Sequence, residues 1–220
     1  MKVCTDACLF GASIAQWIQE LGLNVNQALE IGTGTGLLSL MLAQKTPLII
    51  DAIEIDREAA KQAKENFTAS PWKERLNILE GDATGYFAKQ QYDLIFSNPP
   101  FYEADLRSTN EGKNKAKHDT GLTLDQLLVV ADRNLSAAGF FAVLLPYHRV
   151  EAFIRSAREY NFNLQQRVLV KHTDLHPFFR GILLFGRAAQ PPVETTIAIK
   201  EVGGYSSQFT KLLRDYYLYL

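Results

Sequence analysis

The stretch YDLIFSNPPF, from Tyr92 to Phe101, reads as an apolar strand that stops at two consecutive prolines. Proline has no backbone N–H and holds φ at about −65°, so the chain must leave the sheet here in a fixed direction. The strand end therefore presents the Asn98 amide, carbonyl oxygens without ladder partners and the ring of Phe101. These groups suit the binding of a planar amine. The plainer interpretation is a strand-terminating turn, in which Asn and Pro are common.

A glycine loop lies upstream of this stretch. A short strand, Gln27 to Ile31, runs into Gly32-Thr33-Gly34-Thr35-Gly36 and then an apolar helix from Leu37 to Gln44. Such a loop lets the backbone approach a ligand while the helix start offers free N–H groups. Position 37 is leucine, so the spacing departs from the dinucleotide fingerprint. G-x-G-x-G after Glu30 fits enzymes that use S-adenosylmethionine better, although a loop of this kind can also be simple turn chemistry.

The second strand, Leu48 to Ile55, ends in acidic residues. Glu54 falls about 20 residues beyond the glycine loop, where nucleotide-type folds hold a ribose hydroxyl pair. Asp56 is better explained as the N-cap of a helix from Arg57 to Phe67.

The third strand, Leu76 to Leu79, is followed by Asp82 and Ala83. The carboxylate could accept a hydrogen bond from an adenine amine while the Ala83 N–H meets a ring nitrogen, or Asp82 could simply close a turn. Strands alternating with helices predict a doubly wound, mostly parallel α/β sheet that binds ligands at the carboxyl ends of its strands.

The second half of the chain carries two basic segments. A long polar loop from Tyr102 to Thr120 is interpreted as a lid, a nucleic-acid contact or a solvated loop. Two strands, Gln165 to Val170 and Gly181 to Phe185, are joined by a basic and aromatic segment suited to phosphate and base contacts. The candidate substrate contacts in these segments are Lys113, Lys115, Lys117, His118 and Arg180.

Composition bounds the rest. With 220 residues and 47% hydrophobic content, the chain is long enough to bury one core, and we expect a single domain over residues 1–220. The net charge of −1 means that a nucleic acid would be held by a local patch rather than by a global basic field. Only Cys4 and Cys8 are present and no segment is apolar enough to span a membrane, so we expect a reduced, cytoplasmic protein without a metal site.

The two ends of the chain are predicted to be helical. Residues Cys8 to Leu21 have apolar residues at near-helical spacing, with Thr5 and Asp6 placed to cap that helix. A short extended segment, Thr195 to Ile199, leads to a last helix that ends at Leu220.

These motifs resemble the class I S-adenosylmethionine-dependent methyltransferases, whose sheet has seven strands with the last one antiparallel. Three further segments, Met1 to Ala12, Ser70 to Arg75 and Tyr205 to Leu218, are similar to the bacterial valine-tRNA adenine-N6-methyltransferase family, which modifies the adenosine just 3′ of the anticodon, at position 37. Cys4 and Cys8 stand where that family usually has glycine. Met1 aligns with an internal methionine of the family, so we expect that the family's upstream aromatic and basic segment is missing from this sequence.

The resemblance implies roles for the candidate residues. Those for S-adenosylmethionine are Thr5 and Asp6 near its methionine end, Gly32, Gly34 and Gly36 around its amino acid portion, Glu54 on its ribose, Asp82 and Ala83 on its adenine, and Asn98 beside the methyl group. The catalytic set is Asn98, Pro99, Pro100 and Phe101, with Asn98 and the Pro99 carbonyl on the target amine and Phe101 stacked on the base.

The implied partner is the anticodon loop of a valine tRNA, bound by a monomer. Two kinds of alternative remain. One is a protein glutamine N5-methyltransferase or another rRNA or DNA amino-methyltransferase. The substrate of such an enzyme would bring a similar planar amide or amine group to the same strand end. The other is a noncatalytic nucleotide- or RNA-binding module.

Overall fold

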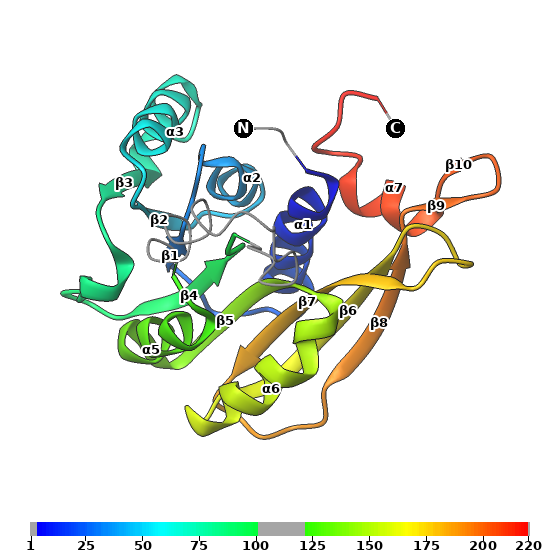
Figure 1. Ribbon diagram of the computed structural model, residues 1–220. Helices are drawn as coiled ribbons and strands as arrows, with labels where there is room; N and C mark the ends of the chain where they lie inside the picture. The colour runs from blue at the N-terminus through cyan, green and yellow to red at the C-terminus, as the bar shows by residue number, and fades with distance from the viewer. Residues whose placement is uncertain (1–3, 101–121, 220) are drawn as a thin grey trace, which may run out of the picture.

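The computed structural model describes residues 4–100 and 122–219 (Figure 1). The α-helices are α1 (Thr5–Glu20), α2 (Leu37–Lys45), α3 (Arg57–Ala69), α5 (Leu124–Asn134), α6 (Val150–Glu159) and α7 (Ser207–Leu213). The strands are β1 (Gln27–Ile31), β2 (Ile49–Glu54), β3 (Leu76–Glu80), β4 (Tyr92–Ser97), β5 (Leu135–Pro146), β6 (Asn163–Lys171), β7 (Phe178–Gly186), β8 (Val193–Ala198), β9 (Lys200–Glu201) and β10 (Gly204–Tyr205). Short 3-10 turns are η1 (Lys73–Arg75), η2 (Ala83–Gly85) and η3 (Tyr147–Arg149).

One sheet organises the described residues, in the order β3-β2-β1-β4-β5-β7-β6-β8. The strands from β3 to β5 pair in parallel, whereas β7 runs antiparallel to both β5 and β6. The predicted doubly wound α/β fold with a mostly parallel sheet and a late antiparallel strand is confirmed. A parallel sheet brings its carboxyl strand ends to one edge, so the ends of β1, β2, β3 and β4 lie together.

The described part of the sheet has eight strands, not the seven expected, and the antiparallel strand is not the last. The short extended segment predicted near Thr195 is β8, which pairs in parallel with β6 from Gln166↔Val193 to Lys171↔Ala198. The outer side of β6 would otherwise expose unpaired backbone groups, and β8 covers it. β9 and β10 form a separate antiparallel ribbon.

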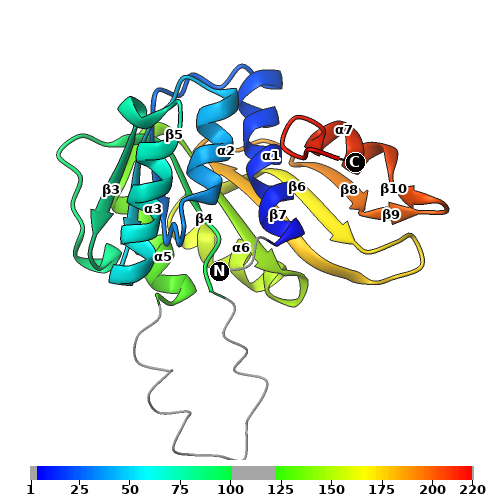
Figure 2. The same ribbon diagram turned by 90° about the horizontal axis from the view of Figure 1, so that it is seen from above.

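Helices cover both faces of the sheet. Figure 2 shows α3, α2 and α1 side by side over one face, with α7 next to α1, and α5 and α6 on the other. Each face buries its own apolar cluster, which includes Phe10, Leu42 and Phe209 on the first side and Leu127, Phe141 and Phe153 on the second. In the described part of the chain, no helix has the length and apolar character needed to cross a membrane.

Local sequence signals explain the starts of α3 and α5. Asp56 caps α3 by accepting a 2.8 Å bond from the Ala59 N–H, as predicted. Helix α5 begins with a capping box in which Thr123 and Gln126 bond each other's backbone N–H groups.

The two terminal helices differ from the prediction. Helix α1 begins at Thr5, not Cys8, so Thr5 and Asp6 form its first turn instead of capping it. A carboxylate in the first turn is favourable because it faces the positive end of the helix dipole. Helix α7 ends at Leu213, well before Leu220, because the chain turns so that Tyr216 and Tyr217 can pack against the first core.

Candidate active site

The glycine loop follows β1, and its glycines have positive φ angles that a residue with a Cβ rarely adopts. Gly32, Gly34 and Gly36 have φ of +74°, +58° and +84°. The N–H groups of Gly32 and Thr33 bond the Ile53 carbonyl at 2.9 and 3.2 Å, which ties the loop to β2. At Gly36 there is no room for a side chain, since a Cβ would lie 2.4 Å from the Phe67 ring.

Glu30 lies beneath the loop instead of facing a ligand. Its buried Oε2 accepts bonds from the Thr33 hydroxyl at 2.7 Å, the Ser39 N–H at 3.2 Å and the Ser39 hydroxyl. Burial raises the pKa of the Glu30 carboxyl to about 7, even though these donors act in the opposite direction. Glu30 therefore connects the end of β1, the loop and the start of α2.

Glu54 joins three strand ends. Its Oε2 accepts a 2.7 Å bond from the Gly34 N–H and its Oε1 a 3.0 Å bond from the Asp56 N–H. Its carbonyl accepts a 2.9 Å bond from the Gly81 N–H at the end of β3. A carboxylate offers about four lone-pair sites, so two acceptor positions remain on this side chain.

Asp82 and Ala83 begin the turn η2 after β3. Asp82 is exposed, and its Oδ1 accepts a 2.8 Å bond from the Thr84 N–H. Arg133 of α5 holds this turn by donating to the carbonyls of Thr84 and Tyr86 at 2.9 and 2.7 Å. Sequence reasoning missed Arg133, because a basic residue in the last turn of an amphipathic helix looks like an ordinary surface charge.

Asn98 stands at the end of β4, next to the glycine loop. The Ser97 hydroxyl donates a 2.8 Å bond to the Ile31 carbonyl, which joins the end of β4 to the end of β1. The Asn98 Oδ1 is buried, and no donor reaches it among the residues that the structure describes. A buried acceptor without a donor is costly, so this oxygen is available to accept a hydrogen bond.

Thr5, Asp6 and Arg180 form another part of the same edge. The Arg180 Nε lies 2.7 Å from the Asp6 Oδ2, an ion pair that fastens the first turn of α1 to the start of β7. The sequence predicts Arg180 as a substrate contact, but not its ion pair with Asp6. The predicted residues Phe101, Lys113, Lys115, Lys117 and His118 lie outside the described residues.

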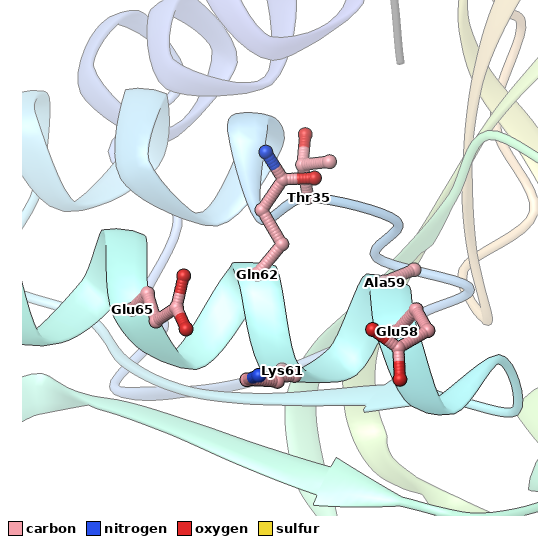
Figure 3. Close-up of a pocket in the computed structure, with 6 residues that line it drawn as sticks. All are labelled: Thr35, Glu58, Ala59, Lys61, Gln62 and Glu65. Carbon is pink, nitrogen blue, oxygen red and sulfur yellow. The ribbon is translucent and has the colours of Figure 1, made fainter.

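A hollow lies between the glycine loop and α3 (Figure 3). It is lined by Thr35, Glu58, Ala59, Lys61, Gln62 and Glu65. Thr35 alone comes from the loop, and Gln62 points toward it from α3. None of the predicted site residues lines this hollow, so the candidate site is described from the strand ends and not from the hollow.

Comparisons with known proteins identify the family and the fold. Residues 13–152 match the family model described as methyltransferase small domain. The tRNA1(Val) (adenine(37)-N6)-methyltransferase of Klebsiella pneumoniae is 38% identical over 225 residues, which covers 100% of this chain and 89% of that protein. The protein of the same name from Cytophaga hutchinsonii is 35% identical, with 100% of this chain and 92% of that protein covered.

Solved structures agree on the fold. A predicted O-methyltransferase from Agrobacterium tumefaciens superposes with a TM-score of 0.72 at 13% identity, over 94% of this chain and 95% of that one. A putative RNA methyltransferase from Pyrococcus horikoshii superposes with a TM-score of 0.58 at 19% identity, over 81% and 83% of the two chains.

Proposed function

The chain belongs to the family of tRNA1(Val) (adenine(37)-N6)-methyltransferases, and we propose that it transfers a methyl group from S-adenosylmethionine to N6 of adenosine 37 in a valine tRNA. The observation that carries the proposal is the buried Asn98 Oδ1, which no described residue satisfies. An exocyclic amine is a donor that fits this acceptor, since it has two N–H groups and a flat ring behind it.

Two acceptors at the strand end act on that amine. The nitrogen of an adenine N6 amine is a poor nucleophile because its lone pair is delocalised into the ring. The Asn98 Oδ1 and the Pro99 carbonyl accept hydrogen bonds from its two N–H groups and draw the nitrogen toward tetrahedral geometry, which frees the lone pair. The protein gains rate from positioning and fixed dipoles rather than from a strong base.

The cofactor cradle is supported by the acceptor positions left open at the strand ends. Glu54 keeps two acceptor sites for a ribose diol, and the exposed Asp82 carboxylate can receive an adenine amine beside the Ala83 N–H. Gly32, Gly34 and Gly36 let the backbone approach the amino acid portion, near Thr5 and Asp6. When bound, S-adenosylmethionine supplies the electrophilic methyl group.

Methyl transfer to RNA tests the proposal. The purified protein is incubated with labelled S-adenosylmethionine and bacterial tRNA that lacks this modification, and the digested nucleosides are separated. We expect N6-methyladenosine, in valine tRNA only. Label that survives ribonuclease and stays with protein would instead support glutamine methylation. Cofactor binding without any transfer would support a noncatalytic module.

A further inference from the structure

The connection between β6 and β7 lies at the same edge of the sheet as Asn98. Ser97 is in register with Val143 of β5, and Val143 with Leu183 of β7. Asn98 is therefore level with Ile182, and Arg180 lies two residues, about 7 Å, farther out. Two to three strand spacings, about 10–14 Å, separate β4 from β7 and β6. The connection therefore lies at the same edge as Asn98, two to three strand spacings away.

A register shift between β6 and β7 changes the direction of the aromatic side chains beside this connection. Val170 pairs with Arg180 and Lys171 pairs with Phe178, so Phe179 is an extra residue on β7. Such bulges re-aim side chains and are common beside active sites. The shift allows Phe178 and Phe179 to make two separate ring contacts.

Each phenylalanine contacts a more exposed ring, Phe179 in a stacked arrangement and Phe178 at a tilt of 48°. His172 and Phe179 are parallel within 2°, with ring centroids 4.2 Å apart. On the other contact, Tyr147 of η3 lies 5.4 Å from Phe178. His172 is exposed and Tyr147 has 40% of its surface exposed. The phenylalanines therefore hold these two exposed rings in place, and His176 also meets the His172 ring at a centroid distance of 6.0 Å.

Two cations frame the rings. The Lys171 Nζ lies 5.7 Å from the Phe178 centroid and the Arg180 guanidinium 5.4 Å from the Phe179 centroid. Lys171 pairs with Asp174 at 2.9 Å, but the Asp174 side chain is 80% exposed. The Lys171 side chain is itself 19% exposed, so a phosphate can approach it from the side on which Asp174 lies in solvent.

We propose that the hairpin surface, defined as Tyr147, Lys171, His172, Phe178 and Phe179, binds the single-stranded nucleotides that flank the target base. Aromatic faces beside cations suit stacked bases and their phosphates, and the surface lies within one or two nucleotides of Asn98. The inference rests on the proposed function, because it takes the target to be a nucleotide in an RNA loop.

The test measures RNA affinity in variants of the exposed residues. Unmodified valine tRNA transcript carrying a fluorophore is titrated at fixed salt, and anisotropy gives the dissociation constant. We expect His172→Ala and Tyr147→Ala each to weaken binding by about 5- to 100-fold, the range for one lost base–aromatic stack. His172→Phe and Tyr147→Phe keep a ring and should bind within about 2-fold of wild type. Lys171→Ala should lower the slope of affinity against salt by about one.

The control is Arg158→Ala. Arg158 is an exposed cation in the last turn of α6, at the opposite edge of the sheet, and its loss should leave RNA affinity unchanged. S-adenosylmethionine affinity and melting temperature should match wild type in every variant. Alanine variants that bind RNA as tightly as the wild type would overturn the proposal that the hairpin surface binds RNA. The proposed function would still hold in that case if the wild type methylates the RNA. A wild type that binds this RNA without methylating it would contradict the function and leave the affinity comparison valid.

Discussion

At the residue scale, the proposed chemistry depends on the Asn98 Oδ1, which acts together with the Pro99 carbonyl. It is buried at the end of β4 beside the glycine loop, where Ser97 fixes the strand end to Ile31. The two prolines that follow cannot donate to it through their backbone. An acceptor with this restriction selects a ligand that brings its own N–H group.

Asn98 variants should separate catalysis from cofactor binding. Asn98→Ala removes the acceptor, and we expect the rate constant for methyl transfer to fall by about 100-fold or more, the scale for one lost positioned hydrogen bond. Asn98→Asp keeps an acceptor oxygen and should retain more activity than the alanine variant. Single-turnover kinetics give the rate, and calorimetry should show S-adenosylmethionine affinity close to wild type. An equal loss of rate and affinity would remove Asn98 from its role at the amine.

Glu30 should make the stability of the fold depend on pH. Its pKa is about 7 in the folded protein against an ordinary 4.5, so between these values the folded state keeps a proton that the unfolded state has released. Stability from this group is therefore full below pH 4.5, falls as pH rises and is lowest above about 7. The difference corresponds to at most about 3 kcal/mol.

Glu30→Gln is the matched neutral variant. Because Gln does not ionise, we expect the free energy of unfolding to change less between pH 5 and pH 8 than in the wild type. Urea unfolding at the two pH values measures this. The same pH dependence in both proteins would show that another group causes it.

At the element scale, the glycine loop is held in two different ways. Gly32 and Gly36 both have positive φ, but a Cβ at Gly32 would meet no atom within 4 Å, whereas one at Gly36 would meet Phe67 at 2.4 Å. The loop therefore requires glycine for backbone conformation at the first position and for both conformation and space at the second.

Alanine substitution measures these two requirements separately. Gly32→Ala should cost about 1–2 kcal/mol from the left-handed backbone alone. Gly36→Ala should cost a further 1–3 kcal/mol or so, because Phe67 must move. Gly36→Ala combined with Phe67→Leu should recover part of the second cost. Denaturant unfolding gives the free energies, and equal losses in the two single variants would contradict the packing argument.

The parallel half of the fold could be predicted from the sequence because its signals are local. Each of β1 to β4 ends in its own glycine, acidic or proline motif, and parallel strands bring these ends to one edge without further information. Contacts between distant segments had no such signal. Asp6 and Arg180 are 174 positions apart, and Arg133 holds a turn 47 positions upstream. The position of β8 at the edge of the sheet likewise had no local signal, because it depends on the unpaired side of β6.

At the scale of the whole molecule, the proposed cofactor site and the proposed RNA-binding surface lie on different halves of the sheet. The strands β1 to β4 carry the proposed cofactor cradle and the amine site, while β6 and β7 carry the hairpin surface beside them. The Asp6–Arg180 ion pair joins α1 on the first core to the start of β7. Cofactor and RNA would thus meet at one edge from different parts of the sheet.

The most direct test of the account is methylation of two valine tRNA transcripts that differ at one nucleotide. One carries adenosine at position 37 and the other guanosine, and mass spectrometry of nuclease fragments locates any added methyl group. We predict one methyl group on the first transcript, as N6-methyladenosine at position 37, and none on the second. Equal methylation of both transcripts, or none on either while S-adenosylmethionine still binds, would contradict the assignment of Asn98 to an adenine amine in this RNA.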